Sequence, residues 1–182
     1  CKKYSIEFMS TPFDIDSTTM LANLGSHGFK VASGDITNLP LLRAIGAVGR
    51  PVFLSTGAST LPEIKMAVDI LESAGAGPIC IMHCTLCYPT RAEHANLTAL
   101  TDIATSFPNY VIGLSDHTIG PLIPSMSVML GCKVIEKHYT VDKSLPDSAD
   151  HWLSSDTGDM IKLLDNLNVA DRAKGTGFKG VQ

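Results

Sequence analysis

Polar and titratable residues follow almost every apolar segment that could form a β-strand. Short runs rich in β-branched residues recur along the chain, and each ends in hydroxyl, acidic or imidazole side chains. Together such side chains could bind an anion, hold a metal ion or transfer a proton. The six clusters are Ser10-Thr11, Ser33-Gly34-Asp35, Ser55-Thr56-Gly57, His83-Cys84-Thr85, Ser115-Asp116-His117 and Glu136-Lys137-His138.

Two histidines are the candidate metal ligands. His117 and His138 each follow a predicted strand, and alternation along a strand places Glu136 on the same face as His138. At the ends of neighbouring parallel strands the two imidazoles could hold a divalent transition metal with open positions for a substrate. Asp116 and Glu136 would then orient the rings. The alternative is that each histidine only ends its strand and bonds to the backbone.

Lys30 is the candidate anion anchor. It lies inside a predicted strand, and in a barrel it would point into the lumen, where a buried ammonium needs an anion nearby. Hydroxyl groups of Thr11, Ser33 and Ser55 could complete a site for phosphate or carboxylate. The alternative is a lysine at the edge of a sheet whose amine reaches water.

The cysteines indicate ordinary thiols in a reducing compartment. Cys80, Cys84 and Cys87 run along a strand and out of it with no second pair downstream, which favours core and loop thiols over a zinc site. The chain has five cysteines, an odd number, and no leader in which an apolar segment follows a charged one. We therefore expect a cytoplasmic protein without a disulfide framework.

The elements that must position these residues are six strands joined by helices. The predicted strands are roughly Ser5-Ser10, Phe29-Ser33, Val52-Thr56, Ile79-Cys84, Val111-Ser115 and Val134-Tyr139. Helices are expected to begin near Asp16, Pro40, Thr60, Asn96, Pro121 and Ser155 or Asp156, and the last has Met160, Leu163, Leu164 and Leu167 as its expected buried stripe.

Alternating strands and helices predict a parallel α/β fold. Six βα units suit an open doubly wound sheet or part of a (β/α)8 TIM barrel, in which all the polar strand ends would meet at one rim. No Gly-x-Gly-x-x-Gly motif follows the first predicted strand, which disfavours a nucleotide-binding sheet.

Composition indicates one globular domain. Hydrophobic residues make up 45% and charged residues 18% of the 182 residues, as in ordinary soluble proteins. The net charge of -4 disfavours nucleic acid and anionic membranes as partners, and no apolar run is long enough to span a bilayer. We expect the domain to cover residues 1–174, with residues 175–182 as a tail or the start of a linker.

Longer motifs surround the strand-end residues. They are Phe8-Met9-Ser10-Thr11-Pro12-Phe13-Asp14, Lys30-Val31-Ala32-Ser33-Gly34-Asp35, Leu54-Ser55-Thr56-Gly57, His83-Cys84-Thr85, Tyr88-Pro89-Thr90, Gly113-Leu114-Ser115-Asp116-His117-Thr118 and Ile135-Glu136-Lys137-His138. Read together, these motifs resemble the N-acetylneuraminate (sialic acid) synthase family, which includes the legionaminate and pseudaminate synthases. The resemblance implies a TIM barrel that condenses phosphoenolpyruvate with an N-acylated amino sugar of the N-acetylmannosamine type, forming a nonulosonic acid and releasing phosphate.

The resemblance also implies roles for single residues. His117 and His138 match metal ligands, for manganese typically, with magnesium or cobalt as alternatives. Glu136, Asp35 and Lys30 match positions that transfer protons or orient and neutralise the substrate. The positions that match phosphoenolpyruvate ligands are Thr11, Lys30, Ser33, Ser55 and Ser115, and those that match sugar ligands are Tyr88 and Asp150.

The resemblance further implies that the family protein is longer than this chain. The first predicted strand matches the third of the family barrel, so two βα units precede it, and a C-terminal antifreeze-like domain follows in a homodimer. Two differences concern the substrates: Leu86 stands where some relatives have Asn, and the loop from Leu145 to Asp150 is longer and more acidic than usual.

Two other functions remain open at this point. A deoxyoctulosonate or deoxyheptulosonate phosphate synthase forms the same carbon-carbon bond on a phosphorylated sugar, but it would need further basic residues at the strand ends. The arginines of this chain, Arg43, Arg50, Arg91 and Arg172, lie outside the strand-end motifs. The second alternative is a non-catalytic truncated barrel that serves only for assembly.

Overall fold

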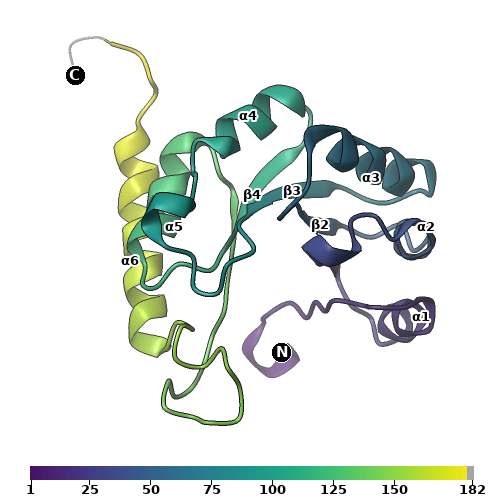
Figure 1. Cartoon of the computed structure of the whole chain (residues 1–182), viewed down its shortest axis with the longest axis horizontal. Helices are drawn as coiled ribbons and strands as arrows, with labels where there is room; N and C mark the ends of the chain where they lie inside the picture. The colour runs from purple at the N-terminus through teal and green to yellow at the C-terminus, as the bar shows by residue number, and fades with distance from the viewer. Residues whose placement is uncertain (180–182) are drawn as a thin grey trace.

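The computed structural model describes residues 1–179, which fold around a parallel five-stranded sheet (Figure 1). The strand order is β1-β2-β3-β4-β5, so every strand pairs with its neighbour in sequence. This order is that of successive βα units in a barrel wall. The strands are β1 Phe29–Val31, β2 Val52–Ser55, β3 Ile79–Cys84, β4 Val111–Asp116 and β5 Val134–Lys137.

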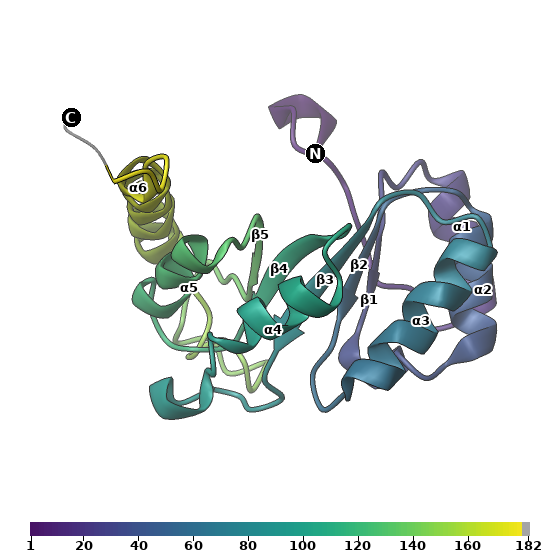
Figure 2. The same cartoon turned by 90° about the horizontal axis from the view of Figure 1, so that it is seen from above.

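In the described part of the chain, six α-helices surround the sheet on three sides (Figure 1). In Figure 1 they follow one another around it from α1 through α4 to α6, and the N-terminal segment lies on the remaining side. Figure 2 shows the same arrangement from above, with α1, α2 and α3 stacked beside β1 and β2. The helices are α1 Ile15–Asn23, α2 Leu39–Ala47, α3 Leu61–Ser73, α4 Ala99–Ser106, α5 Leu122–Ser127 and α6 Thr157–Lys174.

Polar side chains set where the helices begin. The backbone amide of Thr60 donates to the Glu63 carboxylate over 2.7 Å, and the Asp156 carboxylate accepts from the amide of Asp159 over 2.9 Å. The predicted starts at Thr60, Pro121 and Asp156 are confirmed. Three starts differ from the prediction. α1 follows Asp14 and α2 follows Asn38, because these side chains cap the helices in place of Asp16 and Pro40. α4 follows Thr98, which makes no side-chain cap, instead of Asn96.

The hydrophobic core lies between the strands and the helices. Leu54, Ile81 and Leu114 of the central strands are buried there against helix residues such as Ile45 and Leu100. Burial of side chains of this size stabilises a fold by about 1.5–3 kcal/mol each. The core therefore holds the strands in a fixed register and brings their carboxyl ends to one edge.

Two sequence predictions about the elements were wrong. Of the first predicted strand, only Ser10 pairs, in a single bridge to Phe29, and residues 5–9 are exposed. The carbonyl oxygen of Phe8 accepts from the amide of His27 over 3.1 Å, but His27 precedes β1, so the contact does not extend the ladder. In α6 only Leu163 is buried, and Leu164 is 53% exposed, because the helix packs mainly on α5 and on the short 3-10 turn Val128–Leu130.

Within residues 1–179, no helix has both the length and the apolar character needed to cross a membrane.

We expect Gly46→Ala to lower the free energy of unfolding by about 1–3 kcal/mol, although alanine is the better helix former. A Cβ at Gly46 of α2 would lie 2.7 Å from Ala74 Cβ and 2.8 Å from the carbonyl oxygen of Leu71, so α2 and α3 would have to separate. Urea denaturation followed by circular dichroism measures the loss. Gly34→Ala is the control, since its Cβ would meet no atom within 4 Å. Equal stability of the two variants would contradict the close helix contact.

Candidate active site

A cavity of about 610 Å³ opens at the carboxyl ends of the strands, as predicted for a barrel rim. Most of the residues predicted from the sequence line it, although they come from segments far apart in the chain. The predicted residues in its lining are Thr11, Lys30, Ser33, Ser55, Tyr88, Ser115, His117, Glu136 and His138.

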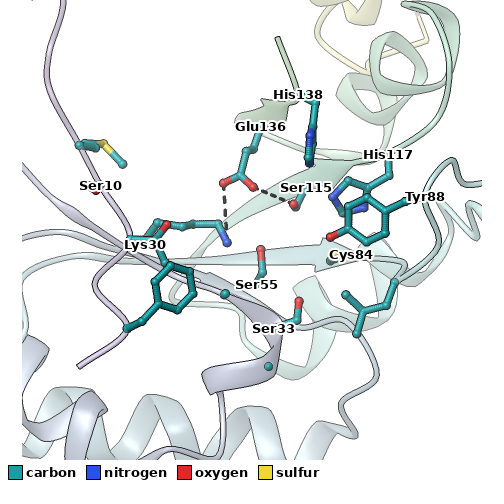
Figure 3. A pocket seen from close by; sticks show the side chains of 16 residues that line it. Ser10, Lys30, Ser33, Ser55, Cys84, Tyr88, Ser115, His117, Glu136 and His138 are labelled. Carbon is teal, nitrogen blue, oxygen red and sulfur yellow. Dashed lines mark hydrogen bonds and ion pairs between the residues drawn. The ribbon is translucent and has the colours of Figure 1, made fainter. Parts of the chain in front are cut away.

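Lys30 carries the positive charge of the cavity (Figure 3). Its side chain is 13% exposed, and Nζ lies 3.7 Å from Glu136 Oε2 and donates to the carbonyl oxygen of Val31 over 3.0 Å. Burial lowers the pKa of Lys30, and the Glu136 carboxylate opposes that shift. Although β1 is an edge strand of the sheet, the ammonium thus lies inside the rim, as the strand pattern predicted, and not in open water.

Glu136 is held between two groups. Ser115 Oγ donates to Glu136 Oε1 over 2.9 Å, while the ammonium of Lys30 faces Oε2. Ser115 and Glu136 are register partners on β4 and β5, so the parallel pairing itself brings them together. A carboxylate fixed in this way can accept a proton at a defined position beside a bound anion.

Hydroxyl groups from β2 and the segment after β1 form a neutral cradle. Ser33 Oγ accepts from the backbone amide of Gly57 over 2.9 Å. Ser55 Oγ is buried and has no hydrogen-bond partner among the described protein atoms. Because a buried polar group without a partner is unfavourable, its place in the cavity lining marks a position for a ligand atom. At Gly57 a Cβ would lie 2.9 Å from Ser33 Oγ, so glycine keeps this cradle open.

The two histidines stand next to each other, with Tyr88 beside them. The ring centroids of His117 and His138 are 5.3 Å apart, and the ring centroid of Tyr88 lies 4.0 Å from that of His117. Nδ1 of His117 is 3.1 Å from the carbonyl oxygen of Thr85, a contact in which Nδ1 carries the proton and Nε2 keeps its lone pair. Burial lowers the pKa of His117, which favours the neutral ring.

The donor set fits an open metal site. Among residues 1–179, no group of three or more His, Cys, Asp or Glu side chains is assembled to hold a metal ion, so the protein would supply the two imidazoles. With metal-nitrogen bonds of about 2.1 Å, two imidazole centroids that share one ion lie roughly 4.5–5.5 Å apart. The observed 5.3 Å falls within that interval. Water and substrate oxygen would complete the shell.

Three predicted residues are placed elsewhere. Asp35 is absent from the cavity lining and accepts a hydrogen bond from Asn38 over 3.2 Å. Asp150 Oδ2 lies 3.8 Å from His138 Nδ1, beside the two histidines but outside the lining. Asp116 does not contact the rings, because alternation turns it to the opposite face of β4, where it pairs with Lys137 over 2.7 Å.

The sequence reasoning missed several residues of the lining. Cys84 was interpreted as a core thiol, yet it is the register partner of Ser115, so strand alternation could have placed it in the cavity. Nothing in the spacing marked the apolar members Met9, Phe13 and Ala32, whereas the resemblance alone pointed to Leu86.

The remaining cysteines follow the expectation of ordinary thiols. Cys80 is buried, Cys87 is exposed, and both are free. Burial raises the pKa of Cys80 to about 12, so this thiol stays protonated at neutral pH.

Fold and cavity together define a partial (β/α)8 barrel with a polar cavity at its strand ends. The chain belongs to the NeuB family, whose family model matches residues 1–179. This confirms the resemblance seen in the strand-end motifs.

Similar proteins support this assignment. An uncharacterized protein of Methanocaldococcus jannaschii is 42% identical, over 98% of this chain and 52% of that protein. The N,N'-diacetyllegionaminic acid synthase of Legionella pneumophila is 39% identical, over 96% of this chain and 49% of that protein. The crystal structure of N-acetylneuraminic acid synthetase from Leptospira borgpetersenii, in complex with citrate, matches with a TM-score of 0.93 at 35% identity, over 100% of this chain and 62% of that one. The chain spans about half the length of the curated relatives it matches.

We expect the imidazole of His117 in the metal-free chain to titrate below the ordinary histidine value of about 6.5, because burial disfavours its charged form. Its contribution to stability is then fully present above the unfolded-state pKa of about 6.5 and is lost as the pH falls through the lower folded-state pKa. Two-dimensional NMR of the ring nitrogens measures the titration, with His117→Gln to assign the signal. A midpoint at or above the ordinary value would contradict the buried, neutral ring.

Proposed function

We propose that this chain supplies the metal-binding and phosphoenolpyruvate-binding part of a sialic acid synthase-type enzyme. The observation that carries the proposal is the pair of imidazoles, 5.3 Å apart, in the same cavity as a buried lysine and an unpartnered serine hydroxyl. Relatives named as synthases of N,N'-diacetyllegionaminic acid and of N-acetylneuraminate 9-phosphate support the reaction class. The reaction would join C3 of phosphoenolpyruvate to C1 of an open-chain N-acylated amino sugar, add water at C2 and release inorganic phosphate.

In this proposal the anion is bound from three directions. The ammonium of Lys30 neutralises phosphate or carboxylate charge, and the free hydroxyl of Ser55 donates to one of its oxygens. Thr11, Ser33 and Ser115 line the same space. Glu136, held beside Lys30 and Ser115, would take the proton of the water that adds. Because Asp35 does not line the cavity, the proposal gives the proton transfer to Glu136.

His117 and His138 would hold the divalent ion, which we propose to be Mn²⁺, with Mg²⁺ or Co²⁺ as alternatives. When bound, such an ion supplies Lewis acidity for the sugar aldehyde. The Nδ1 contact of His117 with Thr85 keeps the ring in the tautomer that ligation needs.

Tyr88 and Asp150 are the proposed sugar contacts. Tyr88 packs on His117 and lines the cavity, and Asp150 lies beside His138 at the rim. Both are therefore near the position of an aldehyde bound to the metal. The relatives act on different sugars by their names, so the proposal extends to the class of N-acylated amino sugars. A homodimer and a cytoplasmic location stay predictions.

We expect isothermal titration to detect Mn²⁺ binding and then phosphoenolpyruvate binding by the whole chain, and His117→Ala and His138→Ala each to weaken Mn²⁺ binding at least about tenfold, because one of only two protein ligands is lost. His27→Ala is the matched control, since this exposed histidine pairs with Glu7 outside the cavity. Equal Mn²⁺ affinity in all four proteins would remove the metal assignment. If the wild type binds neither Mn²⁺ nor phosphoenolpyruvate, the non-catalytic truncated barrel is favoured.

A second expectation separates binding from folding. Ser55→Ala should weaken phosphoenolpyruvate binding about tenfold, or about 1.4 kcal/mol, and leave the free energy of unfolding within about 1 kcal/mol of wild type, because its hydroxyl has no protein partner to lose. Titration calorimetry and urea denaturation measure the two quantities. Ser106→Ala, an exposed hydroxyl deletion on α4, controls for loss of a serine. A Ser55 variant that loses stability but keeps its affinity would show that the hydroxyl serves only the fold.

A further inference from the structure

A buried ion pair lies directly before the two histidines in the chain. Asp116 and Lys137 are register partners at the ends of β4 and β5, and Lys137 Nζ lies 2.7 Å from Asp116 Oδ2. Their side chains are only 3% and 4% exposed. Neither residue lines the cavity, because alternation turns them away from the face that carries Ser115 and Glu136. The pair is therefore a costly feature that the proposed chemistry does not use.

The ion pair also holds the turn that follows β4. The Asp116 carboxylate accepts from the backbone amide of Thr118 over 3.2 Å and from its hydroxyl over 2.9 Å. Lys137 Nζ donates to the carbonyl oxygen of Thr118. Both chain neighbours of His117 are thus bonded to Lys137, the residue that precedes His138.

Other contacts fix the two histidines to the loops around them. The carbonyl oxygen of His117 accepts from the amide of Thr90 over 2.9 Å, and that of His138 accepts from the amide of Ser155 over 2.8 Å. His117 is therefore anchored to the loop after β3 and His138 to the loop before α6, while the offset between the two rings depends on how the end of β4 is aligned with the end of β5. Two side-chain contacts join those two ends: Ser115 with Glu136 on the cavity side, and Asp116 with Lys137, next to the histidines in the chain, on the other side.

An ion pair at this place offers what an apolar pair would not. Apolar side chains of similar volume would hold two strands together at least as well, since burying two charges is expensive. The ammonium, however, has directed donors, and here they meet the Asp116 carboxylate and the Thr118 carbonyl. Directed hydrogen bonds of this kind fix the distance and the angle between the two strand ends, whereas apolar packing fixes only that they are in contact.

We propose that Lys137 is a positioning residue which, through Asp116 and Thr118, sets the separation of the two imidazoles and the tautomer of His117. The metal part of this inference rests on the proposed function, whereas the ring geometry does not. Loss of a contact that orients a ligand typically lowers metal affinity about 10–100-fold. The same loss is expected here, although Lys137 would never touch the ion.

The test compares Lys137→Met with a variant matched for lost stability. Mn²⁺ affinity is measured by calorimetry at a temperature where circular dichroism shows each protein to be folded. Leu54→Ala is the control, because it opens a cavity in the core on β2, away from the strand ends that carry the histidines. Thr118→Val removes the hydroxyl contact to Asp116 and leaves the ion pair intact, so it serves if Lys137→Met does not fold. We expect Lys137→Met to bind about 10–100-fold more weakly, Thr118→Val to weaken binding by a smaller factor, and Leu54→Ala to bind as wild type.

A second readout needs no metal. The ring nitrogens of His117 report its tautomer by NMR, and we expect protonation at Nδ1 in the wild type and in Leu54→Ala, but a mixture of tautomers in Lys137→Met and Thr118→Val. If the wild type binds no Mn²⁺, the proposed function fails and the tautomer alone decides this inference. Folded variants at residues 137 and 118 that keep the wild-type tautomer, and whose Mn²⁺ affinity stays within about twofold wherever the wild type binds, would overturn it.

Discussion

The charge of one lysine governs the arrangement of the cavity. An ammonium in the middle of an apolar strand loses its hydration, and Lys30 is only 13% exposed. It is balanced by Glu136, which lies on the strand farthest from β1 in sheet order, so compensation requires the sheet to curve until the two ends face each other. The hydroxyl of Ser115 then donates a hydrogen bond to the other carboxylate oxygen of Glu136. The pairing of Lys30 with Glu136 thus determines the curvature of the sheet, the charge balance of the cavity and the position of the proposed proton acceptor.

The strand register translates that constraint into a site. Successive register partners on β4 and β5 are Ser115 with Glu136 and Asp116 with Lys137, and each pair forms a direct contact. The two histidines follow immediately and come within 5.3 Å of each other. The cavity side of the two strands carries the groups proposed for chemistry, and the other side carries the buried charges that hold the strand ends. One alignment therefore serves both faces.

Much of this was predictable from the sequence, because strand alternation has a fixed period and parallel strands end at a common edge. That reasoning placed Lys30, His117 and His138 together correctly. It failed where an outcome depends on a partner that local pattern does not specify. Residues 5–9 have the composition of a strand but form no ladder, and Asp116 was assigned to the histidines because its lysine partner lies 21 positions away.

The same limit applies to the helices and to the apolar lining. The spacing of Leu163 and Leu164 suits a buried stripe, yet only the contact with α5 and its following turn decides which of them is covered. Leu86 belongs to a loop whose path is set by tertiary contacts, so its place in the cavity cannot be predicted from the periodicity of the sequence. Elements and faces follow from local chemistry, whereas the choice among possible neighbours follows from the whole fold.

The missing side chain at Gly57 links two segments of the cavity. Both Ser33 Oγ and Leu86 Cγ come within 3 Å of where a Cβ would stand, so an apolar loop residue covers the hydrogen bond from the Gly57 amide to Ser33. A hydrogen bond screened from water is stronger than an open one. The turn after β2 and the loop after β3 are therefore packed against each other at Gly57. A ligand that contacts either segment would constrain both.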